Sequence, residues 1–312
     1  MVSRQPRLCV AVINYNGSRD TLECLRSLGR STYTEFETLV VDNASKDDSV
    51  KRIQAECPEV EVVRLERNAG YAGGCNEALR RALSLDAAQC LVLNNDTIVD
   101  SHAMGLLIEL LRDRPEVAAV GPKVLDYYHR RHILSMGGSI NMKTGWSEHT
   151  GKGEEDRGAP NLPYEVHGFL DGSAMMLSLD VVESTGMMDE SLFLYFEDSD
   201  WCYRARKNGY SLMIEPRAVV WHKLGGSAGP TDPRVQYISN RNRVIFEKRY
   251  ASRTEWLEFW IRVPWSKSQQ VAPNWTARAS GKRDYRSIPH VVKGLTDGLL
   301  GGSHFSGEYR FE

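Results

Sequence analysis

The sequence predicts an α/β fold, in which helices flank a mostly parallel central sheet and a helical appendage follows at the C-terminus. Between residues 7 and 122, short apolar runs alternate with segments of helical periodicity. Polar residues follow the ends of these apolar runs, as at the ligand-binding edge of a parallel sheet. The 312 residues suffice for one large domain, expected at 1–250, with a mainly helical extension at 251–312.

The alternating segments are assigned in order along the chain. Buried strands are predicted at 8–16, 38–43, 60–68, 89–96 and 117–122, and helices between them at 21–28, 47–57, 74–85 and 100–114. The alternation stops from about residue 126 to 163, where a flexible loop near the site is expected. A strand at 218–222 and a helix at 232–250 follow, with Pro233 in the first turn of that helix.

Composition narrows the class of protein. The 39 basic and 41 acidic residues give a formal charge of -2, so nucleic acid is not an expected partner. The six cysteines contain no CxxC pair and are typical of buried thiols in a reducing compartment. The N-terminus lacks a signal-peptide pattern, and no apolar run reaches the roughly 18 residues that cross a bilayer. A cytoplasmic protein is expected.

Polar side chains collect where the predicted strands end. Asp96 could hold a divalent cation that in turn binds a diphosphate, or it could be a turn residue. Asp42 could accept hydrogen bonds from a nucleoside, or cap the next helix. The same edge of the sheet is expected to carry Asn14, Tyr15, Asn68, Asn94 and Asn95.

A second group of candidates lies in the stretch "FLYFEDSDWCYR", residues 193–204, where acids stand among aromatic residues. Asp198 is either a general base or the cap of a helix that begins there. Glu197 is a second ligand, an orienting group or a structural acid. Asp200 and Arg204 are spaced as an i,i+4 pair, which predicts a brace within that helix.

Two further motifs carry weaker signals. The Gly-rich stretch at 70–74 is expected to be a strand-to-helix loop that turns backbone N–H groups toward an anion, but it has no GxGxxG pattern. His222 ends a predicted strand, where an imidazole is either structural or a ligand for Mn2+ or phosphate.

The ordered motifs "VINYNG", "VVDNAS", "NAGYAGGCN", "NND", "DGSAMM", "FEDSDWCYRARKNGY" and "WHKLGGS" resemble glycosyltransferase family 2. This family comprises inverting enzymes with the GT-A fold, a Rossmann-like nucleotide-binding architecture. The resemblance covers residues 7 to about 250, and it is strongest to bacterial rhamnosyl- and galactofuranosyltransferase-like members. The set of motifs in this order is specific, although each motif alone is weak.

The resemblance implies a nucleotide-sugar donor, with UDP- or dTDP-sugars such as dTDP-rhamnose expected. It places the nucleoside over Asn14, Tyr15 and Asp42, and a Mn2+ or Mg2+ ion at Asp96 with His222 as second ligand. The family pattern Asp-x-Asp reads Asn94-Asn95-Asp96 here, which removes a charge from the metal site. Further residues are implied by the motifs: Asp198 as the base, and Gly172, Ser173, Glu197 and Trp201 at the donor and acceptor sugars.

The implied reaction is an in-line displacement, in which Asp198 takes the proton of an acceptor hydroxyl as the anomeric configuration inverts. The acceptor is a saccharide, a lipid-linked sugar or a small molecule. A nucleotidyltransferase and a non-catalytic carbohydrate- or nucleotide-binding protein are the alternatives.

The extension holds Trp256, Trp260, Trp265 and Trp275 among basic residues. These tryptophans could contact the inner membrane surface, pack onto the catalytic domain or form a homodimer contact.

Overall fold

A computed structural model describes residues 8–112, 114–158, 161–224, 232–270, 288–301 and 309. The chain divides into two compact units, each described on its own: residues 1–139, 149–193 and 197–227 form the first, and residues 140–148, 194–196 and 228–312 the second. The second unit groups the helix at 233–250 with the C-terminal helices. The domain boundary expected at residue 250 stays a prediction.

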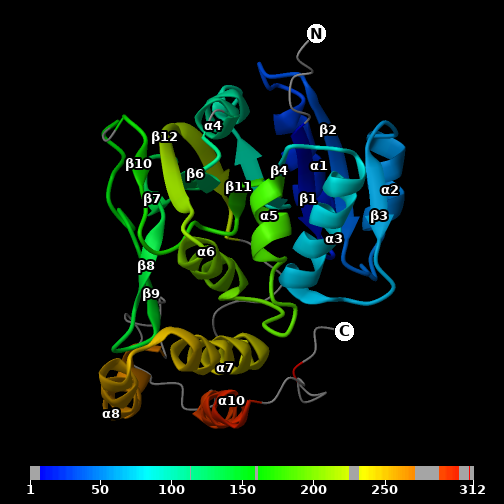
Figure 1. The fold of residues 1–312 in the computed structure, drawn as a ribbon. Coiled ribbons are helices and arrows are strands. Elements are labelled where there is room, and N and C mark those ends of the chain that lie inside the picture. Colours follow the sequence, from blue (N-terminus) through cyan, green and yellow to red (C-terminus); the bar gives the residue numbers. More distant parts are fainter. Residues whose placement is uncertain are drawn as a thin grey trace. The chain divides into compact units, whose positions relative to one another are not determined.

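The first unit is built on a mostly parallel sheet with the strand order β10-β12-β6-β11-β4-β1-β2-β3 (Figure 1). Strand β1 pairs in parallel with β2 and β4, and β6 pairs in parallel with β12, whereas β11 is antiparallel to both of its neighbours. The predicted α/β class is confirmed. The main strands are β1 (Leu8–Asn14), β2 (Phe36–Asp42), β3 (Glu61–Arg64), β4 (Gln89–Asn94), β6 (Val117–Asp126), β11 (Ala174–Ser178) and β12 (Ser211–His222).

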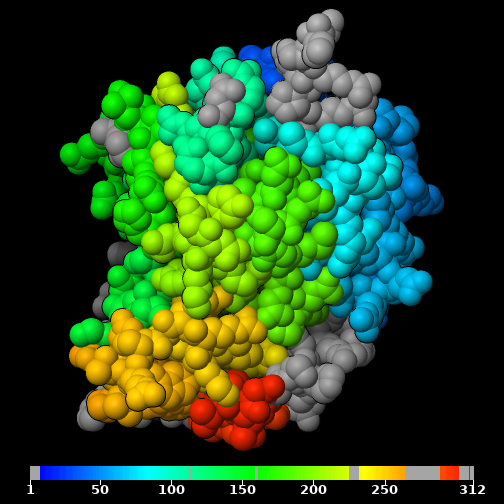
Figure 2. All heavy atoms as spheres, in the orientation of Figure 1, coloured from blue at the N-terminus to red at the C-terminus, as the bar shows by residue number. Residues whose placement is uncertain are grey.

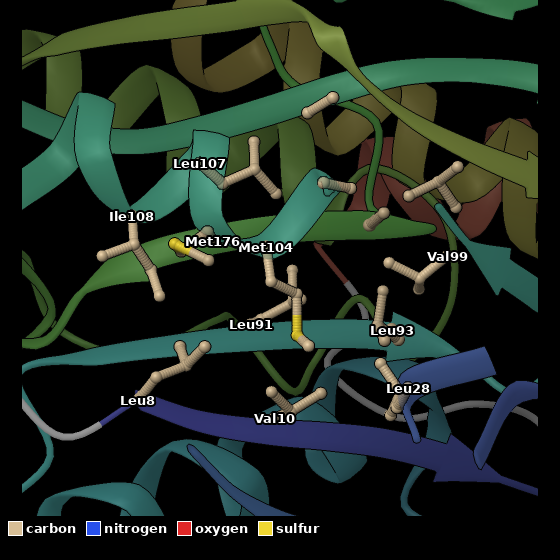
Figure 3. Packing of buried hydrophobic residues seen from close by; sticks show 14 of the residues in the cluster. Leu8, Val10, Leu28, Leu91, Leu93, Val99, Met104, Leu107, Ile108 and Met176 are labelled. Carbon is tan, nitrogen blue, oxygen red and sulfur yellow. The ribbon is translucent and has the colours of Figure 1, made fainter. Parts of the chain in front are cut away.

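Helices cover both faces of this sheet. On one face α1 (Ser18–Leu28), α2 (Ser49–Glu56) and α4 (Ala103–Arg112) enclose a buried apolar cluster. Figure 3 shows Leu8 and Val10 of β1 and Leu91 of β4 in this cluster, with Met104 and Leu107 of α4 packed above them. Because successive strand residues point to opposite faces, the same strands also pack against helices on the other side.

The other face carries α3 (Gly70–Ser84), α5 (Leu179–Thr185) and α6 (Glu197–Lys207). A Cβ added at Gly74 of α3 would lie 2.8 Å from Ile13 of β1, so this helix approaches the sheet more closely than a side chain would allow. Helices α5 and α6 lie side by side in both the ribbon and the space-filling view (Figures 1 and 2).

Two sequence predictions of secondary structure were wrong. The glycines at 70–74 lie in the first turns of α3 instead of in a loop, with Gly70 taking the left-handed φ of 74°. The segment from 126 to 163 holds strands where a loop was expected: β7 (Ile133–Ser135), β8 (Gly138–Asn141) and β9 (Trp146–His149). These strands, like β5 (Thr97–Val99) and β10 (Tyr164–Glu165), have at most four residues, too few to show a period.

Helix α6 is braced as its spacing predicted. Trp201, Cys202 and Ala205 are fully buried, and the Trp201 indole donates a hydrogen bond to the Gly186 carbonyl. Arg204 Nε lies 2.9 Å from Asp200 Oδ2. The same guanidinium donates to the carbonyl of Thr185, the last residue of α5, and to that of Met187, just after the helix. The pair therefore ties the helix to the preceding segment.

The second unit contains α7 (Pro233–Tyr250), α8 (Arg253–Gln270) and α10 (Ile288–Leu300). Asp232 caps α7 by accepting from the Arg234 N–H, with Pro233 in the first turn. Gly294 and Gly298 let α10 lie against α7, since a Cβ at either would fall within 2.6 Å of an α7 carbonyl oxygen.

The tryptophans of the extension are only partly described. Trp256 and Trp260 pack against a buried cluster that includes Phe259 and Val263 of α8. The side chain of Trp265 and the whole of Trp275 lie outside the described residues. Within the described part of the chain, none of the helices combines the length and apolar character needed to span a bilayer. The membrane and dimer contacts stay predictions.

We expect Arg204→Met to destabilise the protein by about 3–5 kcal/mol, because it leaves the Asp200 carboxylate, 1% exposed, without its guanidinium. Urea unfolding followed by circular dichroism measures this. Arg19→Met is the matched control: Arg19 is 86% exposed beside Glu23, and its loss should cost less than about 1 kcal/mol. Equal effects of the two substitutions would contradict the buried brace.

Candidate active site

A buried polar network lies where β1, β2 and β4 end. Asn14 donates to Asp42 Oδ1 at 2.7 Å, while the Ser45 N–H donates to Asp42 Oδ2. Asn95 donates to Asn14 Oδ1 at 3.2 Å and to the Gly17 carbonyl at 3.3 Å. Asn14 and Asp42 are fully buried, so their hydrogen bonds hold the loops at 14–17 and 43–45 in place. The structure brings together Asn14, Asp42 and Asn95, which were expected at this edge of the sheet. Within this network, Asn14 is hydrogen-bonded to both of the others.

Asn94 and Asp96 lie on the other side of this turn, beside the end of β12. His222 Nε2 lies 3.0 Å from Asp96 Oδ1 and 3.4 Å from Asn94 Nδ2. Strand β5 pairs with β12 at this point, with Thr97 opposite His222, and so fixes their register. Although burial lowers the pKa of His222, the hydrogen bond and charge of Asp96 raise it above its usual range. The pairing of Asp96 with His222 agrees with their expected placement.

These residues fit a hard divalent ion of the Mn2+ or Mg2+ type. A carboxylate, an imidazole and an amide oxygen are suitable donors, and such ions in phosphate-binding sites usually take one or two carboxylates plus substrate phosphates. Within the described ranges, no group of three or more His, Cys, Asp or Glu side chains could hold a metal alone. Asp96 and His222 would therefore need the ligand to complete the coordination.

Asp198 lies near the start of α6 and holds the turn that precedes β11. Its Oδ2 accepts from the Gly172 N–H at 3.0 Å, and its Oδ1 accepts from the N–H and the hydroxyl of Ser199. A Cβ at position 172 would lie 2.9 Å from Asp198 Oδ2, so any larger residue there would displace the carboxylate. Burial and the negative charge of Asp171 raise the pKa of Asp198 to about 6, against the hydrogen bonds that lower it. A carboxylate with this pKa can accept a proton near neutral pH.

Asp171 is a site residue that the sequence analysis did not single out. Its Oδ1 accepts from the Ser173 N–H at 2.9 Å, and its Oδ2 lies 3.6 Å from His149 Nδ1. Despite burial, the charges of His149 and His222 hold the pKa of Asp171 below its usual range. Asp171 is the first residue of "DGSAMM", so the motif itself contained the signal.

Glu197 lies beside Asp198 but in a different environment. It is 4% exposed, and its Oε2 has no hydrogen-bond partner among the described residues. Burial first, and then the charge of Asp198, raise the pKa of Glu197 well above its usual range. Burial, together with nearby charges that include Glu197, raises the pKa of Tyr71 and of Cys75 on α3. The Tyr71 hydroxyl donates to the Gly172 carbonyl.

The backbone before α6 is held in an uncommon conformation. Phe193, Tyr195 and Phe196 all have positive φ, at 63°, 67° and 71°. Side chains other than glycine take this left-handed region at a cost of about 1–2 kcal/mol each. Asn242 of α7 donates to the carbonyls of Leu194 and Tyr195, which fixes this part of the second unit. Such strain is typical of functional segments.

The remaining predicted site residues fall into two groups. Trp201 is fully buried and bonded to Gly186, so its expected contact with a sugar was wrong, because the residue lies on the apolar face of α6. Ser173 is 4% exposed and its carbonyl accepts from the Asn94 N–H, which joins the turn before β11 to the metal-binding candidates. Asn68 accepts from the Gly70 N–H at the start of α3, and Tyr15 is half-buried after β1.

The chain is similar in sequence to known glycosyltransferases. A hexosyltransferase of low-salt glycan biosynthesis from Haloferax volcanii is 26% identical over 211 residues, which are 66% of this chain and 63% of that protein. An N-acetylglucosaminyl-diphospho-decaprenol L-rhamnosyltransferase of Mycobacterium tuberculosis is 25% identical over 305 residues, covering 92% of this chain and 98% of the relative. The chain thus spans less than two thirds of the first relative and nearly all of the second.

Among solved structures, GalNAc-T7 with UDP, GalNAc and Mn2+ matches with a TM-score of 0.65 at 14% identity, over 96% of this chain and 57% of that one. A mannosyltransferase from Pyrobaculum calidifontis, in complex with GDP-Man and Mn2+, matches with a TM-score of 0.59 at 15% identity, over 96% and 89%. These likenesses establish the GT-A fold. The family model described as "Glycosyl transferase family 2" matches residues 9–178, more than half of the sequence, and the chain therefore belongs to glycosyl transferase family 2.

Proposed function

We propose that this protein transfers a sugar from a nucleoside diphosphate donor to an acceptor hydroxyl with inversion, and that Asp198 is the general base. The observation that carries the proposal is the environment of Asp198. Its carboxylate is oriented by the N–H groups of Gly172 and Ser199, and its pKa of about 6 leaves it ionised yet basic at neutral pH. Asp96 and His222 supply a second charged centre of the same unit.

In this reaction Asp198 removes the proton of the acceptor hydroxyl while that oxygen attacks the anomeric carbon. The bond between the anomeric carbon and the diphosphate oxygen breaks, and the nucleoside diphosphate leaves. A divalent ion held by Asp96 and His222 would supply charge for the departing diphosphate. Asn94 lies against His222, and Asn95 holds the loop at 14–17, so both position this edge of the sheet.

The relatives indicate which substrates to try first. The Mycobacterium relative is named for rhamnosyl transfer to a sugar on a diphospho-decaprenol, and a Shigella flexneri relative is a dTDP-rhamnosyl transferase. We therefore propose a dTDP- or UDP-sugar as donor, with dTDP-rhamnose as the first candidate, and a lipid-linked sugar as acceptor.

Asp198→Asn should lower kcat by about two to four powers of ten, because the general base is lost. Its affinity for UDP or dTDP should change by less than about twofold, since the amide has nearly the same volume. Turnover of dTDP-rhamnose and calorimetric titration measure the two effects. Asp180→Asn, on the exposed surface of α5, is the control and should leave both values unchanged. Wild-type turnover in Asp198→Asn would exclude this base.

The pH dependence of kcat should show one acid limb with a midpoint near 6. Asp198 has a raised pKa, so it becomes protonated and inactive as the pH falls through 6, and it is fully ionised above about pH 7. Rates measured between pH 4.5 and 8.5 in buffers of constant ionic strength test this. A profile that stays flat down to pH 4.5 would contradict the assignment.

His222→Ala should abolish the part of nucleotide binding that depends on Mn2+. Thermal unfolding with dTDP or UDP, with and without Mn2+, measures it, because a ligand of the native state raises the melting temperature. The increment added by Mn2+ should disappear in His222→Ala and persist in His167→Ala, whose side chain is 76% exposed. An undiminished increment in His222→Ala would place the ion elsewhere.

A further inference from the structure

The buried acid beside the proposed base has no counter-charge among the residues that the structure describes. Glu197 is 4% exposed, and none of these residues is a hydrogen-bond partner of its Oε2. The charged groups that act on it are Asp198 and Asp200, both acids of the same helix, while Tyr71 and Cys75 face it from α3. Within the described part of the chain, no lysine or arginine is among the groups that act on Glu197. Arg204, on the same helix, is bonded to Asp200.

The sizes of the opposing free-energy terms decide whether Glu197 is ionised or protonated. An ionised carboxylate taken out of water without a partner costs several kcal/mol. Two terms favour the ionised form: a hydrogen bond from the Glu197 backbone N–H, and the positive end of the α6 dipole, since Glu197 is the first residue of that helix. The dipole is worth at most about 2 kcal/mol. Repulsion by the neighbouring Asp198 adds to the cost. Protonation removes both penalties.

We propose that Glu197 keeps its proton at neutral pH, so that the adjacent pair carries one negative charge, on Asp198. This inference rests on the proposed function and specifies how that site is tuned. If Glu197 were ionised, its charge would raise the proton affinity of Asp198 further, and the base would be protonated at neutral pH. A neutral Glu197 keeps Asp198 ionised.

A matched comparison comes from Asp171, a second acid whose charge acts on Asp198. Asp171 accepts from the Ser173 N–H and lies near His149, so it is stabilised in its ionised form. Asp171 and Glu197 thus flank the same base, one charged and the other neutral. Asp171→Asn removes a negative charge and should therefore change the pKa of Asp198. Glu197→Gln removes no charge and should leave that pKa unchanged.

The test uses the titration of Asp198 in the substrate-free protein, followed by NMR of 13C-labelled aspartate carboxyls and assigned with Asp198→Asn. In Glu197→Gln the midpoint should stay at its wild-type value of about 6. In Asp171→Asn it should move to lower pH by about half a unit or more. A downward shift in Glu197→Gln would show that Glu197 is ionised in the wild type and would overturn the proposal.

Infrared spectroscopy gives a second, independent measurement. The wild-type protein at pH 7.5 should show the carbonyl stretch of a protonated carboxyl that is absent from Glu197→Gln. Glu247 of α7, with a pKa of about 8, should contribute a similar band, so the two spectra are compared as a difference. No lost band would refute a protonated Glu197. Both measurements need no substrate, so they stand even if turnover in Asp198→Asn removes the proposed base.

Discussion

The site depends on one contact, the hydrogen bond from the Gly172 N–H to Asp198 Oδ2 at 3.0 Å. It joins the turn before β11 to the first turn of α6, and a Cβ at position 172 would lie 2.9 Å from the same carboxylate oxygen, so a larger residue there would displace it. Tyr71 holds the following peptide through the Gly172 carbonyl, and the Ser173 carbonyl accepts from the Asn94 N–H at the end of β4. The sheet, α3 and α6 thereby place the proposed base relative to the strand end that leads to Asp96.

The same arrangement buries several acidic side chains, and this burial costs stability. Asp96, Asp171, Glu197 and Asp198 lie in one unit, and burial raises the pKa of the last two. The backbone before α6 adds three residues of positive φ. Such costs are common at functional sites, where the rest of the fold compensates. Here the compensation includes the braced helix α6, with its fully buried Trp201 and the Asp200–Arg204 pair.

The sequence predicted the fold well because its long elements have clear periods. The central strands and the helices α1 to α4 follow runs that only one secondary structure accommodates, and the Asp200–Arg204 spacing identified the face of α6. The short strands β7 to β9 carry no such period. For the site, the motifs named Asp96, Asp198 and His222 as candidates, and the roles of these residues stay predictions. The motifs could not show that Asn14, Asp42 and Asn95 hydrogen-bond one another, or that Trp201 points into the core, because these contacts join residues far apart in the sequence. Asp171 stands first in the motif "DGSAMM", but its contact with His149, from a segment expected to be a loop, could not be predicted.

The proposed placement of the metal and the base is tested most directly by a crystal structure with dTDP or UDP and Mn2+, with data collected to locate the anomalous signal of manganese. We expect one strong anomalous peak between Asp96 and His222, in contact with the diphosphate. We also expect the Asp198 carboxylate to face the space beyond the terminal phosphate, where the sugar would lie. A peak at other residues, or a diphosphate bound away from Asp96 and His222, would contradict this placement.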